Sequence, residues 1–323
     1  MLDPHTQALL AELGAMAMRH AGADPAVPAR ALAREMFLAF AGRDPAGERC
    51  RVEAQVAGPI GPGLRLYRPP AAGSAPLPCV LFLHGGGWSL GDLDSYDGLV
   101  RALCAASGAA FLAVDYRLAP DHPFPGAFED SVHAAHWLFT QAETLGVDPE
   151  RLALMGDSAG GALAACTAFA THKVIAWRAQ ALIYPMLDIA SPDAVYPSRQ
   201  HYGDGRFLLA AAAIEAAARW YVGTDPALRR DPRVSPMFIP ELERLPATLL
   251  LSAALDPLAD EAAAFAQRMQ AAGGACEHWV RADCVHAYLS FGVLAQARRD
   301  RLELARWLAP VLGLGGPTPG APA

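Results

Sequence analysis

Short apolar segments alternate with helical segments from about residue 50 to residue 285, and this alternation constrains the fold more than any other feature of the chain. The first two runs, VEAQVAG (52–58) and LRLYRP (64–69), have the pattern of a hairpin. The later apolar runs are CVLFLHG, AAFLAVDYR, RLALMG, AQALIYP, ATLLLSAALD and CEHWVRA. Helices are expected between them at about 94–107, 127–145, 158–172 and 258–272. The alternation predicts an α/β fold, with a mostly parallel sheet and helices on both of its faces.

Two segments interrupt this alternation, and both are expected to be helical. Residues 1–45 precede the first strand, and residues 186–240 separate two core strands by more than a short loop requires. We interpret both as parts of a helical cap over the strand ends. The predicted organisation is an N-terminal cap segment (1–45), a first core part (46–185), a cap insertion (186–240), a second core part (241–312) and a disordered tail rich in glycine and proline (313–323).

Charge and cysteine usage exclude several classes of protein. The net charge is -7, and Lys173 is the one lysine among 26 basic residues, so no basic run indicates a nucleic-acid partner. The chain starts with an amphipathic pattern rather than a signal peptide, and it has no run of about 18 apolar residues. We therefore expect a cytoplasmic protein without a membrane span. The six cysteines form no CxxC pair, so neither a disulfide framework nor a zinc site is indicated.

The segment MGDSAGG contains a G-x-S-x-G motif at the junction of a predicted strand and a predicted helix. Such a junction is a sharp turn that lifts the serine hydroxyl, here that of Ser158, above the carboxyl edge of the sheet. Side chains at Gly156 and Gly160 would collide with the neighbouring strand and helix in so tight a turn. The motif can also arise by chance in a glycine-rich chain, so its significance depends on partners elsewhere in the sequence.

A serine nucleophile needs a base and an acid that orients the base, and strand ends limit the candidates. Asp256 ends ATLLLSAALD and is expected at the same edge as Ser158. Asp260 lies four residues later, where a carboxylate in the first turn of a helix has a stabilising role, so we favour Asp256. His286 follows the next strand, CEHWVRA, in the loop DCVHAYLSF, which gives the chain order serine, acid, histidine.

Other histidines and glycines have alternative interpretations. His133 and His136 have a spacing that could bind a metal, but no HExxH motif or third ligand accompanies them. The run Gly85 to Gly87 follows a strand that ends at His84, and its bare N–H groups could stabilise an oxyanion. A phosphate-binding loop is the alternative, but neither GxxxxGK[ST] nor GxGxxG is present. His84 is expected to brace this loop.

These residues resemble the hormone-sensitive-lipase family of esterases, the bacterial family IV lipolytic enzymes. The resemblance covers some 270 residues and rests on six separated places. These are HGGGW, VDYRLAPDHPFPGAFED, GDSAGG, YPMLD, LDPLADE and the histidine loop. The sequence departs from the family at Ala287, where glycine is common, and at Asp121, where glutamate is usual.

The resemblance implies an α/β-hydrolase fold with a helical cap and an ester hydrolase that needs no cofactor or metal. It implies Ser158 as nucleophile, His286 as general acid and base, and Asp256 as orienting carboxylate. It further implies that Gly86, Gly87 and Ala159 supply the N–H groups of the oxyanion hole.

The expected substrate is a small-molecule ester with a short or medium acyl chain, a preference implied by the same resemblance. Trp88, Leu187 and Phe207 are candidates for lining its pocket, and each could equally belong to the core. An amidase, a lactonase or a hydrolase of a specialised natural-product ester would use the same triad, and a non-catalytic ligand receptor is a further alternative. The strand near 275–281 could pair with its own copy as an edge strand and form a homodimer.

Overall fold

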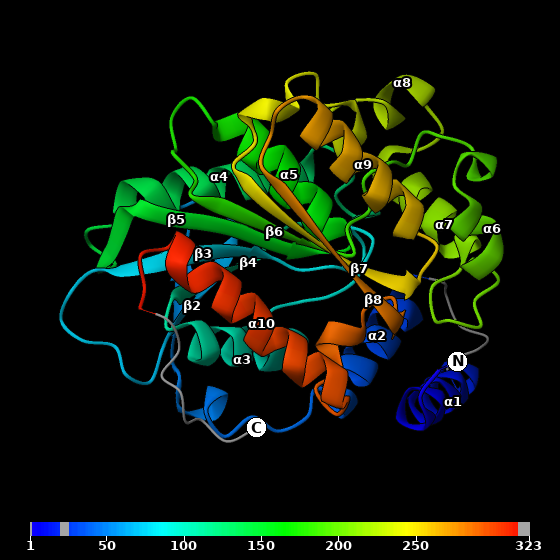
Figure 1. Ribbon diagram of the computed structural model, residues 1–323, viewed down its shortest axis with the longest axis horizontal. Coiled ribbons are helices and arrows are strands. Elements are labelled where there is room, and N and C mark those ends of the chain that lie inside the picture. The colour runs from blue at the N-terminus through cyan, green and yellow to red at the C-terminus, as the bar shows by residue number, and fades with distance from the viewer. Residues whose placement is uncertain (1, 20–25, 316–323) are drawn as a thin grey trace.

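The computed structural model describes residues 2–19 and 26–315. Its centre is a sheet of eight strands in the order β1-β2-β4-β3-β5-β6-β7-β8 (Figure 1). β2 pairs antiparallel with β1 and with β4, and the remaining pairs are parallel. The strands are β1 Arg51–Val56, β2 Gly63–Arg68, β3 Leu77–Leu83, β4 Ala110–Asp115, β5 Val147–Asp157, β6 Ala179–Ile183, β7 Ala247–Leu255 and β8 Cys276–Val285. The predicted mostly parallel α/β sheet is confirmed, including its opening hairpin.

Helices cover both faces of the sheet. One face carries α4 Gly126–Gln141, α5 Ala159–Thr171 and α9 Ala259–Ala271, and the other carries α3 Asp97–Ser107 and α10 Ala295–Val311 (Figure 1). The strands supply alternate side chains to these two layers, as in β3, where Leu81 packs in one apolar cluster and Phe82 in the other. The central strands are buried on both sides and therefore consist of almost continuous apolar residues.

The helices outside this core lie beyond the carboxyl ends of the parallel strands (Figure 1). They come from the two segments that interrupt the alternation: α1 Pro4–Arg19 and α2 Ala26–Phe40 from the first, and α6 Pro197–Tyr202, α7 Ala211–Val222 and α8 Pro226–Arg229 from the second. Arg30 of α2 donates hydrogen bonds to the carbonyl oxygens of Ser89 and Ala119, which connects α2 to the loops after β3 and β4. Among the helices that the structure describes, none offers an apolar stretch long enough to cross a bilayer.

Two strand boundaries and one helix differ from the sequence-based expectations. β5 begins at Val147, before the expected run, and β8 continues to Val285, so His286 directly follows the strand. β8 continues because its pairing with β7 resumes at Leu255 and Val285 after a shift in register. The helix α10 was not among the expected helices. The tail predicted for residues 313–323 lies outside the described residues from residue 316 onward.

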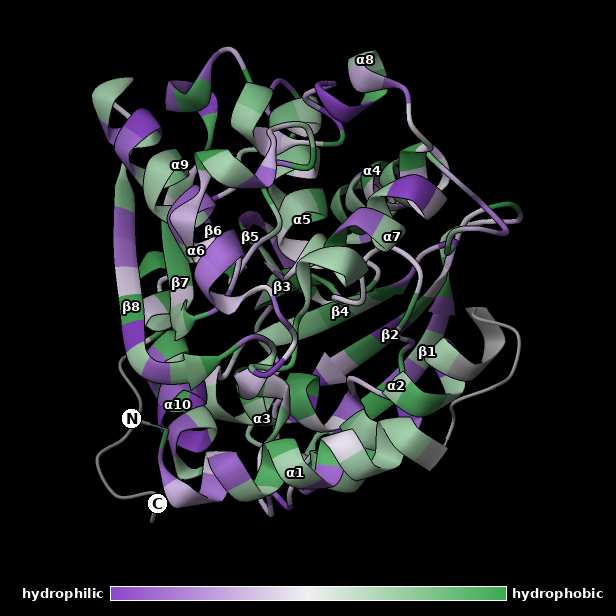
Figure 2. Cartoon of the chain, turned by 90° about the vertical axis from the view of Figure 1, so that its right-hand side faces the viewer, coloured by the Kyte–Doolittle hydropathy of each residue, from purple (hydrophilic) through white to green (hydrophobic). Residues whose placement is uncertain are grey.

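β8 is an edge strand of the sheet, and its hydropathy differs from that of its neighbour. Figure 2 shows hydrophilic and hydrophobic segments along β8, whereas β7 is largely hydrophobic. The first eight residues of β8 are half-buried or exposed, its last two, Cys284 and Val285, are buried, and Val280 keeps 54% of its surface exposed. The edge is therefore open to solvent over much of its length.

Candidate active site

Ser158 occupies the sharp turn between β5 and α5. Its φ of 54° and ψ of -121° lie in a region that L-amino acids rarely adopt, and the turn holds it there through a hydrogen bond of 2.8 Å from its N–H to the Ile183 carbonyl oxygen. A Cβ on Gly156 would lie 2.8 Å from the Leu83 carbonyl oxygen, and one on Gly160 would lie 2.6 Å from the Leu83 carbonyl carbon. Glycine is therefore required at both positions, for the reason that the sequence analysis gave.

Three polar side chains from separate strand ends meet at this turn. His286 Nε2 lies 2.9 Å from Ser158 Oγ, and His286 Nδ1 lies 2.7 Å from Asp256 Oδ2. Because an ionised carboxylate only accepts hydrogen bonds, Nδ1 carries the proton and Nε2 is left to accept the serine hydroxyl proton. Ser158 and His286 are each 6% exposed and Asp256 is 1% exposed, so the contacts are largely screened from water. The arrangement can activate a serine hydroxyl for nucleophilic attack.

The two candidate carboxylates have different partners. Asp256 uses Oδ2 for His286 and Oδ1 to accept the N–H of Leu258 at 2.9 Å. Asp260 lies in the first turn of α9, and its Oδ2 accepts the N–H of Ser198 at 2.7 Å. The structure therefore brings Asp256, and not Asp260, to the histidine.

The glycine loop after β3 presents backbone N–H groups near the serine turn. Gly86 and Gly87 have φ values of 113° and 58°, which glycine adopts without strain. Within the part of the chain that the structure describes, their N–H groups donate to no protein acceptor. Ala159 is the first residue of α5, where backbone N–H groups have no intrahelical acceptor. These three N–H groups are available to bind a developing negative charge.

Asp157 anchors the glycine loop through a hydrogen bond to its first glycine, a role that was not predicted from the sequence. Its carboxylate accepts the N–H of Gly85 at 2.7 Å and the hydroxyl of Tyr96 at 3.0 Å, and the residue is 1% exposed. Burial raises the pKa of Asp157 to about 6, against the lowering effect of these hydrogen bonds. The sequence signal was an acidic residue inside an otherwise small and apolar turn.

His84 supports the same loop from the side, as expected. Its ring stacks on Tyr116 with centroids 4.2 Å apart, and its Nδ1 lies 2.8 Å from the Gly85 carbonyl oxygen. Burial lowers the pKa of His84 to about 4, so the ring is neutral at pH 7. A neutral ring is suited to bracing the loop.

The three residues proposed for a substrate pocket pack in two apolar clusters, Trp88 and Leu187 in one and Phe207 against the other. Trp88 is 1% exposed and stacks on Tyr221 with centroids 4.5 Å apart, while Leu187 is fully buried in the same apolar cluster. Phe207 packs against the cluster on the other face of the sheet, edge-on to Tyr202. Trp88 and Leu187 thus have the core packing that the sequence analysis named as their alternative.

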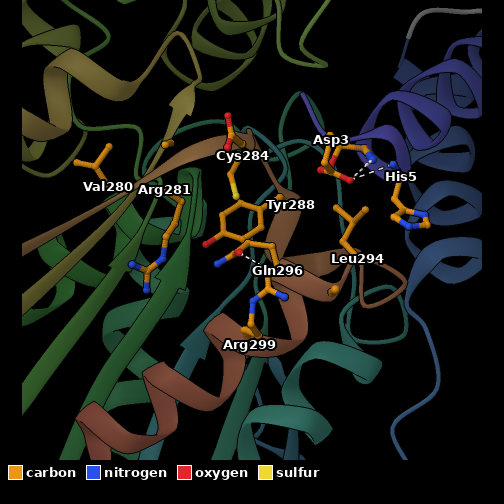
Figure 3. Close-up of a pocket in the computed structure, with 13 residues that line it drawn as sticks. Asp3, His5, Val280, Arg281, Cys284, Tyr288, Leu294, Gln296 and Arg299 are labelled. Atoms are coloured by element: carbon orange, nitrogen blue, oxygen red, sulfur yellow. Dashed lines mark hydrogen bonds between the residues drawn. The ribbon is translucent and has the colours of Figure 1, made fainter. Parts of the chain in front are cut away.

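A cavity of about 420 Å³ lies at the start of α1, between the end of β8 and the start of α10 (Figure 3). Tyr288, Cys284 and Gln296 line it, and Tyr288 Oη donates to Asp300 at 2.7 Å. None of the three residues that meet at the serine turn lines this cavity, so it is separate from the candidate active site.

The histidine pair considered for metal binding lies on α4, where His133 is exposed and His136 is half-buried. In residues 2–19 and 26–315, no three His, Cys, Asp or Glu side chains are grouped closely enough to hold a metal ion.

The fold, together with a serine, a histidine and an aspartate at adjacent strand ends, defines the class of α/β hydrolases. The chain belongs to this family, because the family model described as alpha/beta hydrolase fold matches residues 80–290. It is 40% identical over 249 residues to an ethyl acetate hydrolase from Pseudomonas putida, and the alignment covers 75% of this chain and 76% of that protein. It is 36% identical over 244 residues to the carboxylesterase NlhH from Mycobacterium tuberculosis, and the alignment covers 73% of this chain and 74% of that protein.

Solved structures agree over nearly the whole chain. An esterase from Pyrobaculum calidifontis superimposes with a TM-score of 0.85 at 31% identity and covers 95% of this chain and 98% of its own. An ester hydrolase from the metagenome of Lake Arreo, in complex with a bipyridine phosphonate derivative, superimposes with a TM-score of 0.87 at 30% identity and covers 97% of this chain and 100% of its own. These similarities confirm the resemblance to the hormone-sensitive-lipase family of esterases.

Proposed function

We propose that this protein hydrolyses carboxylic esters through an acyl-enzyme formed on Ser158. The observation that carries the proposal is the continuous hydrogen-bonded chain from Ser158 Oγ through His286 to Asp256. The names of the relatives, which are esterases and carboxylesterases, support the ester as the bond that is cleaved.

In the proposed first step, His286 Nε2 accepts the hydroxyl proton of Ser158 while Oγ forms a bond to the ester carbonyl carbon. The carbonyl oxygen becomes an oxyanion, which the N–H groups of Gly86, Gly87 and Ala159 stabilise. Collapse of this intermediate breaks the bond to the alkoxy oxygen, which leaves as the alcohol with the proton from His286.

Water then attacks the acyl-enzyme in the same way. His286 removes a proton from the water, the oxyanion forms again at the same N–H groups, and Ser158 recovers its proton as the carboxylic acid leaves. Throughout, Asp256 holds the imidazole in the tautomer with the proton on Nδ1 and stabilises the imidazolium that forms. All the acid–base steps are assigned to residues of this chain.

For the substrate, we propose small esters with short or medium acyl chains. The helices beyond the strand ends, which we propose act as a cap, restrict access to Ser158 and so disfavour long acyl chains. The ethyl acetate hydrolase among the relatives supports the same preference. Turnover of p-nitrophenyl acetate, butyrate, octanoate and palmitate tests it, and we expect kcat/KM to fall at the longer chains. Faster turnover of amides or lactones than of any ester would contradict the proposal.

We also propose that two copies of the chain associate through β8. The support is its edge position and the exposure of Val280, which is 54%. Light scattering should give a dimer mass for the wild type and a monomer mass for Val280→Lys. Ile60→Lys, at a position 90% exposed in the turn between β1 and β2, should leave the dimer intact. A monomeric wild type would contradict this part of the proposal.

The cytoplasmic location expected from the sequence stays a prediction, which cell fractionation would check.

A further inference from the structure

A buried ion pair joins α6 to the first turn of α9, next to the loop that carries Asp256. Glu261 is fully buried, and its Oε2 pairs with Nη2 of Arg199, a residue that is itself 3% exposed. The other carboxylate oxygen, Oε1, accepts the N–H of Leu187 at 2.6 Å. One carboxylate therefore links α6, α9 and the loop after β6.

Arg199 also holds the loop after β6. Its Nη2 donates to the Asp188 carbonyl oxygen, and its guanidinium lies over the ring of Tyr196, 4.9 Å from the centroid. Tyr196 Oη in turn donates to Asp188 Oδ2 at 2.7 Å. The segment from Asp188 to Arg199 is thereby closed on itself and attached to α9.

Ser198, the neighbour of Arg199, attaches α6 to the residues directly after Asp256. Ser198 Oγ donates to the Pro257 carbonyl oxygen at 2.9 Å and accepts the N–H of Asp260 at 3.2 Å. The N–H of Ser198 donates to Asp260 Oδ2 at 2.7 Å. One of these hydrogen bonds holds the short loop between β7 and α9, at whose start Asp256 contacts His286, and the other two hold the first turn of α9 directly after that loop.

The loop after β6 also touches the serine turn, because the N–H of Met186 donates to the Ser158 carbonyl oxygen at 3.0 Å. Tyr184 in the same loop packs on His286, with ring centroids 5.0 Å apart. The polar groups of α6 therefore bind two loops that contact all three residues of the proposed triad.

A buried ion pair is a costly way to stabilise a fold, because the desolvation of both charges offsets most of their attraction. Burial raises the pKa of the Glu261 carboxyl to about 7, against the lowering effect of the Arg199 guanidinium. In proteins, apolar pairs of similar volume often stabilise such a buried contact as well as an ion pair does. The directional hydrogen bonds of the pair, which apolar groups lack, are what the site gains.

We propose that Ser198, Arg199 and Glu261 are positioning residues of the reaction, which hold the Asp256 loop and the loop after β6 in the register that aligns the triad. This inference rests on the proposed ester hydrolysis. It requires that loss of these contacts lowers kcat more than it changes KM, because the contacts act on the orientation of Asp256 and His286 and not on the bound ester.

The test uses two variants, chosen so that neither leaves a buried charge unpaired. Ser198→Ala removes the hydrogen bond to the Asp256 loop, at Pro257, and one of the two to the first turn of α9, with little change in volume. Arg199→Met/Glu261→Gln removes both charges of the pair together. For each variant, kcat and KM with p-nitrophenyl butyrate, the rate of Ser158 phosphonylation by an alkyl p-nitrophenyl phosphonate, and the unfolding temperature are measured at 25 °C and upward.

We expect kcat and the phosphonylation rate to fall about tenfold in both variants with KM within twofold, at a temperature where each is fully folded. The matched control is Arg229→Met/Glu215→Gln, which removes an ion pair of 2.8 Å between α8 and α7 in the same segment. It should leave both rates unchanged. Arg199→Lys in the otherwise wild-type chain keeps a positive charge beside Glu261, so it should retain part of the rate that the double variant loses.

Unchanged rates with a lowered unfolding temperature in the two test variants would overturn the inference, because the contacts would then serve stability alone. This outcome differs from failure of the proposed function, in which the wild type itself would hydrolyse no ester and would not be phosphonylated at Ser158.

Discussion

At the scale of single residues, the site depends on which of two aspartates meets the histidine. Asp256 and Asp260 are four positions apart and similar in sequence context. The strand β7 ends at Leu255, so Asp256 faces the serine turn, whereas Asp260 has entered α9 and binds Ser198. The sequence favoured the correct contact because strand ends and helix turns place carboxylates differently.

Substitution of these two aspartates should therefore have unequal effects. Asp256→Asn should lower kcat by about 10⁴-fold, because the amide favours the wrong tautomer of His286. Asp260→Asn should lower kcat by less than about tenfold, since the amide oxygen can still accept the N–H of Ser198. Initial rates with p-nitrophenyl butyrate measure both, and a larger loss at Asp260 would reverse the assignment.

Asp157 should make the stability of the protein depend on pH. Its pKa is raised from 3.8 to about 6 in the folded state, so between these values the folded state binds more protons than the unfolded state. This contribution to the free energy of unfolding falls as the pH rises through that window and is constant above it. Asp157→Asn removes this pH-dependent contribution. The free energy of unfolding of the variant minus that of the wild type should therefore increase by roughly 3 kcal/mol from about pH 4 to pH 6. Urea unfolding across this range tests it, and a difference independent of pH would contradict it.

At the scale of elements, the turn from β5 into α5 was the most predictable part of the structure. Its glycines are required because the Leu83 carbonyl lies against both of them. The apolar pattern of each expected strand or helix predicts a buried face. In the structure, each of these elements lies in the sheet or packs on one face of it.

Gly160→Ala should destabilise the protein by about 3 kcal/mol, because the new methyl group overlaps backbone that cannot move. Gly14→Ala in α1 is the control, since its Cβ meets nothing within 4 Å and alanine favours a helix by about 0.5–1 kcal/mol. Thermal unfolding should show a lower unfolding temperature for Gly160→Ala and an equal or higher one for Gly14→Ala. Equal unfolding temperatures for Gly160→Ala and the wild type would contradict the packing argument.

Some elements could not be placed from the sequence. The register shift that extends β8 to Val285 depends on pairing with β7, which a single-sequence pattern does not contain. The contacts of Ser198 and Arg199 with α9 join residues about 60 positions apart, and the local sequence around these polar residues gave no sign that they would be buried. The packing of Trp88 and Phe207 against different apolar clusters was likewise not contained in the local pattern.

At the scale of the whole molecule, the strand order brings distant segments of the chain to one edge of the sheet. Ser158 follows β5, the loop with Tyr184 follows β6, Asp256 follows β7 and His286 follows β8, and these four strands are consecutive neighbours. A parallel arrangement places all four carboxyl ends together, so the triad is a consequence of topology. The glycine loop after β3, on the other side of β5, completes the site.

The measurement that tests this account most directly is the hydrolysis of p-nitrophenyl butyrate by the wild type and by Ser158→Ala. The account predicts that the variant loses about 10⁶-fold in kcat while it keeps the wild-type unfolding temperature. Ser74→Ala, in an exposed position of the loop before β3, should retain full activity. A Ser158→Ala variant that turns over the ester at the wild-type rate would contradict the account.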